Sequence, residues 1–252
     1  MDIRYYSDLH LEHMDATELK TFLQKMNTVP ITDNTVCLLA GDIGHPREPH
    51  YDLFFQNIHR HFPKTFVIPG NHEYYSVTRT NTIEQTNALM EDYFQKYENI
   101  TLLNNSWEIY KGYCFIGSVL WTHIFNPERT ITDMGAIPDF NVEKYNALNK
   151  TCVEFLQEAI HSNERCIVMT HHMPSEQLID PKYKNSTLMP YNQWFFCDVE
   201  YLFVKDRVTA WFYGHTHTPL KTTLREVPFL CNPNGYPHED SGFQFDSLFT
   251  IE

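Results

Sequence analysis

The chain has 252 residues, of which 42% are hydrophobic, and a formal net charge of −13 from 19 basic and 32 acidic side chains. At this length a chain can bury roughly three quarters of its unfolded surface, which is enough for one large α/β domain over residues 1–252. The acidic balance argues against long nucleic acid as a partner, because such binding depends on cationic contacts to phosphates.

The cysteine pattern favours a reducing compartment. The six cysteines form no CxxC pair, and several lie inside apolar, strand-like runs: Cys37, Cys114, Cys152, Cys166, Cys197 and Cys231. They behave as small core residues, so we expect a cytoplasmic protein. Neither an 18-residue apolar run nor a basic, apolar leader is present, so no membrane contact is expected. The oligomeric state stays open.

In chain order, strands and helices are predicted to alternate. Short apolar runs, rich in β-branched or aromatic residues, predict buried strands at residues 3–6, 36–39, 66–68, 166–169 and 209–213. Helices are predicted at residues 17–26, 51–62, 82–97 and 142–162, with a shorter one at 199–204. A hairpin at 107–120 and a β-rich tail at 220–230 and 243–251 add further strands. This order predicts two sheets packed face to face with helices outside.

Each of the five predicted strands is followed by residues that can bind metal or catalyse. The segments are Ser7-Asp8-Leu9-His10, Gly41-Asp42, Gly70-Asn71-His72-Glu73, Thr170-His171-His172 and Gly214-His215-Thr216-His217. The carboxyl ends of strands in an α/β sheet converge on one crevice. The pairs at i, i+2, Asp8 with His10 and His215 with His217, are expected to lie on one face of an extended segment.

These residue types indicate a two-metal site. Carboxylate, amide and imidazole ligands suit Mn²⁺, Fe, Co²⁺ or Zn²⁺ better than Ca²⁺, which prefers oxygen ligands only. A closed structural zinc site is disfavoured because the set contains no cysteine. The ligands exceed what one tetrahedral ion needs, which favours two ions about 3.5–4 Å apart sharing a carboxylate.

The ordered blocks resemble the calcineurin-like metallophosphoesterase superfamily, whose pattern is DxH, GD, GNH, a strand-terminal His and GHxH. The match spans residues 8–217, and SDLHLE, LAGDIG, GNHEYY, THHMPS and GHTHTP resemble its small bacterial-type branch. The resemblance implies a four-layer αββα sandwich of two mixed β-sheets flanked by helices. It also implies a cofactor of two divalent metal ions, with Mn, Fe or Zn as candidates.

The resemblance also implies a role for each matching residue. Asp8, His10 and His217 would hold the first metal, and Asn71, His171 and His215 the second, with Asp42 between them. His171 is preferred to its neighbour because it directly follows the strand. His72 would be the catalytic acid. His45 and His172 each lie within a few residues of a proposed ligand. For each, a role in supporting a ligand or contacting substrate is weighed evenly against an ordinary structural position.

The expected activity is hydrolysis of a phosphomonoester or phosphodiester bond by metal-activated hydroxide. The substrate would be small, with nucleotides among the candidates. A nuclease is the first alternative and a non-catalytic metal-binding scaffold the second. Protein Ser/Thr phosphatase activity is disfavoured because Asp42 is not followed by Arg-Gly.

Three further segments bear on the substrate. The 232–236 loop has Asn234 where relatives of this branch often carry Arg, which removes a cation that could bind phosphate. Residues 124–140 and 172–197 are long, proline-containing and aromatic, and such loops are uncommon unless they are functional or disordered. We hypothesise that they wall the metal pocket and select the substrate, with a structural excursion as the alternative.

Overall fold

Two mixed β-sheets face one another in the computed structural model, which describes residues 1–76, 80–125, 127, 129–184 and 187–251. The first sheet has the order β11 (Leu248–Thr250), β1 (Asp2–Tyr6), β2 (Thr35–Ala40), β3 (Lys64–Ile68) and β4 (Ile100–Leu102). The second has the order β5 (Ser106–Tyr110), β6 (Tyr113–Ser118), β7 (Cys166–Thr170), β8 (Val208–Tyr213), β10 (Val227–Cys231) and β9 (Leu220–Leu224). Central pairs are parallel, and β11, β5 and β9 join antiparallel at the edges.

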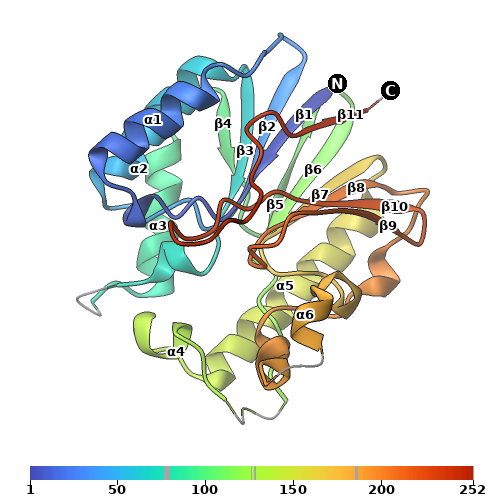
Figure 1. The fold of residues 1–252 in the computed structure, drawn as a ribbon. Helices are drawn as coiled ribbons and strands as arrows, with labels where there is room; N and C mark the ends of the chain where they lie inside the picture. Colours follow the sequence, from blue (N-terminus) through green and yellow to red (C-terminus); the bar gives the residue numbers. More distant parts are fainter. Residues whose placement is uncertain (77–79, 126, 128, 185–186, 252) are drawn as a thin grey trace.

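Helices cover the outer faces of both sheets (Figure 1). Helices α1 (Ala16–Met26), α2 (Pro49–His61) and α3 (Ile83–Phe94) lie over the first sheet, and α5 (Val142–Ser162) lies over the second. Capping boxes at Asp15 and Thr82 fix the starts of α1 and α3, since each side chain accepts a backbone N–H of the first turn. The predicted four-layer αββα sandwich is confirmed.

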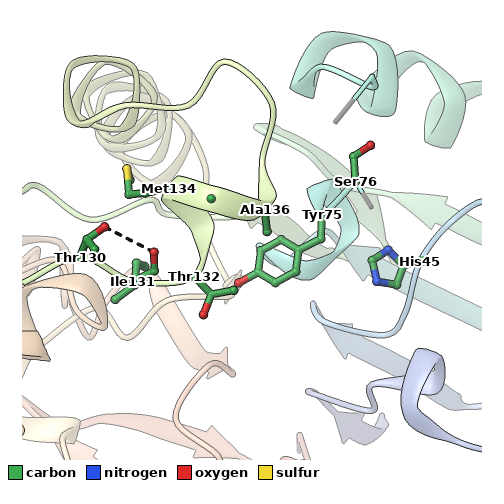
Figure 2. Close-up of a pocket in the computed structure, with 9 residues that line it drawn as sticks. His45, Tyr75, Ser76, Thr130, Ile131, Thr132, Met134 and Ala136 are labelled. Carbon is green, nitrogen blue, oxygen red and sulfur yellow. Dashed lines mark hydrogen bonds between the residues drawn. The ribbon is translucent and has the colours of Figure 1, made fainter. Parts of the chain in front are cut away.

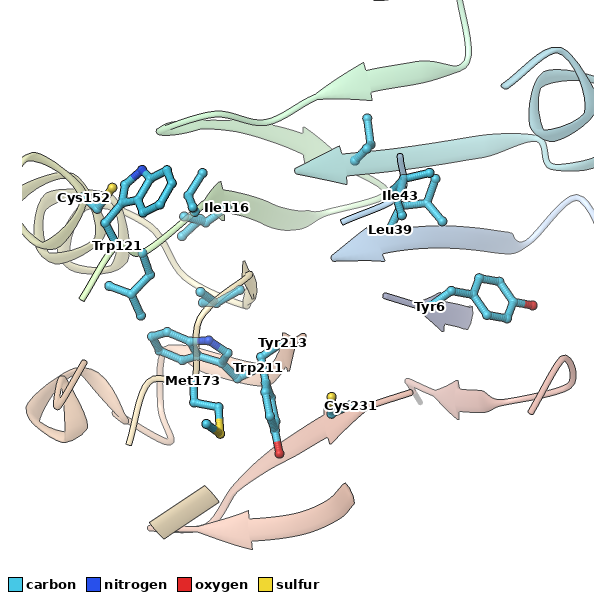
Figure 3. Packing of buried hydrophobic residues seen from close by; sticks show 14 of the residues in the cluster. Tyr6, Leu39, Ile43, Ile116, Trp121, Cys152, Met173, Trp211, Tyr213 and Cys231 are labelled. Atoms are coloured by element: carbon cyan, nitrogen blue, oxygen red, sulfur yellow. The ribbon is translucent and has the colours of Figure 1, made fainter. Parts of the chain in front are cut away.

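Alternate residues of each central strand enter different cores. In β2, Val36 and Leu38 belong to an apolar layer between the sheets, whereas Cys37 and Leu39 belong to the larger cluster that includes the helix side. Phe66 and Phe115 stack across the inner layer with ring centroids 4.2 Å apart. Figure 3 shows part of the larger cluster, where Trp121 lies beside the α5 residue Cys152. Burial on both faces explains why these strands read as continuous apolar runs.

Several details differ from the predictions. The β-rich tail divides between the sheets, because β9 and β10 extend the second sheet while β11 pairs with β1. Strand β4 was not predicted, and only a 3₁₀ turn, Glu200–Leu202, forms in 199–204. The two irregular segments carry only short helices, α4 (Asp133–Ala136), α6 (Pro181–Lys184) and 3₁₀ turns, and residues 126, 128, 185 and 186 lie outside the described part.

Two observations bear on the expectations about cysteine pairing and membrane contact. All six cysteines are buried and unpaired. Among the described helices, none combines the length and apolar character needed to cross a membrane.

Candidate metal centre

Turns after β1, β2, β3, β7 and β8 bring all the candidate ligands together. Each lies within four residues of the end of its strand, and the set is Asp8, His10, Asp42, Asn71, His171, His215 and His217. Two groups among them place one ligand atom per residue within 4.8 Å of one another: Asp8, His10 and His217, and Asp42, His171 and His215. The first sheet supplies four of the seven and the second sheet three.

The backbone is left-handed, not extended, in the turns after β1, β2 and β8. Asp8, His10, Asp42, His215 and His217 have φ between 40° and 66°. The extended geometry expected for the i, i+2 pairs is therefore wrong, but the pairs still converge, because Asp8 and His10 share one group and His215 and His217 line the same pocket. Such φ values are uncommon for non-glycine residues and cluster at functional sites.

Two glycines are required by close approach. A Cβ on Gly70 would lie 2.1 Å from Oδ1 of Asp42, and one on Gly41, where φ is 84°, would lie 2.5 Å from Nδ1 of His171. Both contacts are far shorter than a real Cβ makes. The glycines therefore allow Asp42 and His171 to approach these turns.

In the first group, two imidazole nitrogens face each other. Nε2 of His10 lies 3.0 Å from Nε2 of His217, and the latter lies 3.6 Å from Oδ1 of Asp8. Nδ1 of His10 lies 3.1 Å from Glu12, and Nδ1 of His217 lies 2.6 Å from Glu239. A carboxylate only accepts, so each Nδ1 donates its proton, and in the neutral rings both Nε2 atoms carry lone pairs. Two facing lone pairs suit a shared cation.

The second group, with Asn71 beside it, brings further metal-ligand atoms together. Nδ2 of Asn71 donates to Asp133, so its Oδ1 faces Nε2 of His171 at 3.0 Å. That Nε2 also lies 3.3 Å from Oδ2 of Asp42, while Nδ1 of His171 donates to the carbonyl of Ala40. Although burial opposes it, the charge of Asp42 raises the pKa of His171 to about 10. A proton on this ring and a divalent cation would compete for the same acceptors.

His215 supplies an orphaned ligand atom. Its Nε2 is buried, with no hydrogen-bond partner in the part of the chain that the structure describes. Burial holds the pKa of His215 well below its usual range, so the ring is neutral. Buried polar atoms are normally paired, so this one fits a metal ion.

Asp42, a member of the second group, also faces the first. Its Oδ2 is 3.9 Å from Nε2 of His10 in one group and 3.3 Å from Nε2 of His171 in the other, while its Oδ1 accepts the backbone N–H of His72. Burial opposes ionisation, but the neighbouring imidazoles of His171 and His72 hold the pKa of Asp42 well below its usual range. The carboxylate is therefore charged and placed to contact a cation of either group.

His72 is held between a carboxylate and a phenol. Its Nδ1 lies 3.1 Å from Oε1 of Glu12, and its Nε2 lies 3.2 Å from the hydroxyl of Tyr236. The ring stacks on Tyr75 at 4.2 Å. Burial opposes the change, but the charges of Asp42 and Glu12 raise the pKa of His72 to about 9. The ring can therefore carry a proton on the nitrogen that faces the pocket.

Sequence reasoning missed Glu12, Glu73 and Glu239, although their motifs contained a signal for the first two. Glu12 follows His10 by two residues and lies 3.1 Å from both His10 and His72. Glu73 is buried and accepts backbone N–H groups from Gly70, Asp42, Ile43 and Gly44 at 2.6–3.3 Å. It joins the turns after β2 and β3. Only the fold brings Glu239 to His217.

The structure bears on three residues whose roles the sequence left open. Both ring nitrogens of His172 face protein partners, the Val119 carbonyl and the Tyr145 hydroxyl, and the ring lies 4.2 Å from that of His215. His172 therefore supports a candidate ligand. His45 lines a hollow beside the pocket. Asn234 directs its amide to the backbone carbonyls of Leu9 and Gly235, so it does not replace the missing cation.

A pocket of about 520 Å³ opens beside both groups. Its lining includes Asp42, Asn71, His72, His215 and His217 together with side chains from both irregular segments. A second hollow, of about 830 Å³, shares Tyr75 and residues 130–132 with it. Figure 2 shows Tyr75 directed toward Thr132, with His45 on its other side. The two irregular segments thus do wall the pocket.

Comparison with known proteins gives matches over nearly the whole chain. Residues 1–219 match the model of the calcineurin-like phosphoesterase family. An uncharacterized protein, L509 of Acanthamoeba polyphaga mimivirus, is 32% identical over 267 residues, which cover 96% of this chain and 93% of that protein.

Two solved structures share the fold at low sequence identity. Phosphopantetheinyl hydrolase from Mycobacterium tuberculosis is similar with a TM-score of 0.75 at 16% identity, covering 95% of this chain and 93% of that one. GAP50, described as the anchor in the inner membrane complex of Plasmodium, is similar with a TM-score of 0.50 at 9% identity, covering 92% and 70%. From the family match, the chain belongs to the calcineurin-like phosphoesterases and is a metal-dependent hydrolase of phosphoric esters.

Proposed function

We propose that this protein hydrolyses a phosphomonoester or phosphodiester bond of a small substrate at a centre of two divalent cations. Asp8, His10 and His217 would hold one cation, and Asn71, His171 and His215 the other, with Asp42 contacting both. The observation that carries this proposal is the 3.0 Å approach of two Nε2 atoms whose Nδ1 partners are both carboxylates. Mn, Fe and Zn all suit this mixed ligand set.

The bound cations would supply charge stabilisation for the phosphoryl oxygens and a hydroxide near neutral pH. The remaining steps belong to the chain. Glu12 fixes the proton on Nδ1 of His72, so that Nε2 faces the pocket and can give a proton to the departing oxygen. No side chain is needed as a nucleophile, so we expect inversion at phosphorus.

The pocket favours a small substrate over nucleic acid. Its volume is in the range of sites for small molecules. The chain also carries 13 more acidic than basic side chains, which disfavours binding of the nucleic-acid backbone. A nuclease is therefore ranked second. The fold match to GAP50 leaves a non-catalytic scaffold as the third proposal. The two groups of candidate metal ligands disfavour it.

Two further proposals concern the chain as a whole. We propose that residues 1–252 act as one domain, because both sheets contribute to one inner core. We also propose a reducing, cytoplasmic location, supported by six buried, unpaired cysteines.

The test is hydrolysis of p-nitrophenyl phosphate and bis-p-nitrophenyl phosphate by metal-stripped protein reloaded with Mn²⁺, Zn²⁺, Fe²⁺ or Mg²⁺. We expect turnover that requires metal, that Asp42→Asn abolishes and that the exposed-site control Asp92→Asn retains. The ratio of the two rates separates monoesterase from diesterase. Absence of turnover with every metal, in protein that metal analysis shows to be loaded, would contradict the proposal.

A further inference from the structure

The wall of the pocket beside the candidate metals is aromatic and aliphatic. The side chains that form it come from the 3₁₀ turn after β3, the α4 region and the segment between β7 and β8: Tyr75, Ile131, Tyr183, Leu188, Tyr191 and Phe195. Each is partly or fully exposed, so their surfaces are available to a ligand. The ring of Phe195 lies 4.7 Å from that of His215. An organic group attached to a phosphoryl at the metals would therefore meet apolar surface at once.

The charge of the pocket also favours an uncharged organic group over a second phosphate. Among the described lining residues there is no lysine or arginine, whereas Asp133 and Glu239 are acidic. The adjoining hollow adds only His45 as a basic group among its described residues. Lys182, on the wall segment, lies outside the lining and pairs with Asp180 at 3.3 Å. A second phosphate held away from the metals and His72 would therefore lie beside carboxylates, with no lysine or arginine among the described lining residues to neutralise it.

We propose that this pocket selects substrates in which one phosphoryl group is joined to a neutral organic group bearing an aromatic ring, and that it rejects substrates with a second phosphate. This inference rests on the proposed function, which places the phosphoryl group at the two cations. Aromatic rings of a ligand pack on aromatic walls with a preferred geometry that an aliphatic chain lacks.

The first experiment compares 2-phenylethyl phosphate with ethyl phosphate on the metal-loaded protein. Both leave as alkoxides of similar basicity, so the ratio of their kcat/KM values reports the organic group. We expect the phenyl ester to be favoured at least about tenfold, as apolar side groups are in enzyme pockets. Tyr191→Ala should reduce this ratio by several fold. The control Tyr201→Ala removes an exposed aromatic outside the lining and should keep the ratio.

A second experiment tests the charge. We expect propane-1,3-diol bisphosphate to be a poorer substrate than propyl phosphate. Thr132 lines the pocket and is exposed, so Thr132→Lys can place a cation there. In this variant the ratio of the kcat/KM values for the two substrates should shift several fold toward the bisphosphate. A bisphosphate that is already the better substrate of the natural protein would overturn the charge argument.

Binding separates this inference from the proposed function. Titration calorimetry of 2-phenylethylphosphonate and ethylphosphonate on metal-loaded protein needs no turnover. Tighter binding of the phenyl compound without hydrolysis of any ester would support the pocket and contradict the hydrolase. If the two phosphonates bind equally and the two esters have equal kcat/KM, with turnover intact, the proposed selectivity of the pocket is wrong. The proposed hydrolase activity would then still hold.

Discussion

At the scale of single residues, the hydrogen-bond partner of one histidine ring nitrogen determines whether the other nitrogen is available to bind a metal. Nδ1 of His171 donates to a carbonyl and its Nε2 faces Asn71 and Asp42, whereas both nitrogens of His172 face protein groups. Two adjacent histidines thus have different capacities. The family resemblance predicted His171 as the ligand, because it directly follows the strand where the family's ligand lies, but the sequence contains no information on these hydrogen-bond partners.

Glu12 gives the first prediction. It faces Nδ1 of both His10 and His72, so Glu12→Gln should disturb the proton on both rings. We expect kcat to fall by about tenfold to a hundredfold, the usual effect of losing a group that orients a ligand. Steady-state kinetics at saturating metal measures this, with the exposed-helix variant Glu154→Gln as control. An unchanged kcat would remove Glu12 as a positioning residue.

His72 gives a prediction that depends on the leaving group. Its Nε2 faces the pocket beside Tyr236, where it can protonate a departing oxygen. With metals bound, His72→Ala should slow alkyl phosphates by about a hundredfold or more, because an alkoxide needs this proton. It should slow p-nitrophenyl phosphate much less. Normal turnover of an alkyl phosphate by this variant would exclude His72 as the required acid.

At the scale of elements, the central strands and the β5–β6 hairpin could be predicted, and the turns that carry the candidate ligands could not. Strands β1, β2, β3, β7 and β8 are buried on both faces, so their apolar runs are visible in the sequence. The left-handed turns that follow β1, β2 and β8 depend on contacts between distant segments, such as the hydrogen bond from the Asp8 backbone N–H to the Gly41 carbonyl at 3.0 Å. Strand β4, three residues long, is too short to show a period.

Glu73 joins two of these turns, which makes it a structural prediction. Its carboxylate accepts four backbone N–H groups, and the NH₂ of a glutamine cannot accept any. Glu73→Gln should therefore lower the free energy of unfolding by about 1–3 kcal/mol, the cost of leaving a buried donor unpaired. Urea unfolding of the metal-free protein measures it, and Glu91→Gln on the exposed side of α3 is the control. Equal midpoints for the two variants would contradict this role.

At the scale of the whole molecule, the site exists only where the two sheets meet. Asp8, His10, Asp42 and Asn71 come from the first sheet, and His171, His215 and His217 from the second. The two-sheet fold and the candidate ligands could be predicted together because one ordered set of motifs carries both. The division of the β-rich tail between the sheets could not, since strand pairing over 240 residues leaves no local signal.

Because each group draws ligands from both sheets, cation binding should stabilise their packing. The candidate ligand atoms of the two sheets lie close together in the fold, and a ligand that binds only the folded state adds about 2.7 kcal/mol at a hundredfold excess over its Kd. For a chain of this size that corresponds to a rise in Tm of about 5–10 °C. Thermal unfolding with a chelator and then with added Mn²⁺ or Zn²⁺ measures it. Asp42→Asn should lose most of the response while Asp92→Asn keeps it, and a Tm independent of metal in all three proteins would mean that these residues do not bind a cation in common.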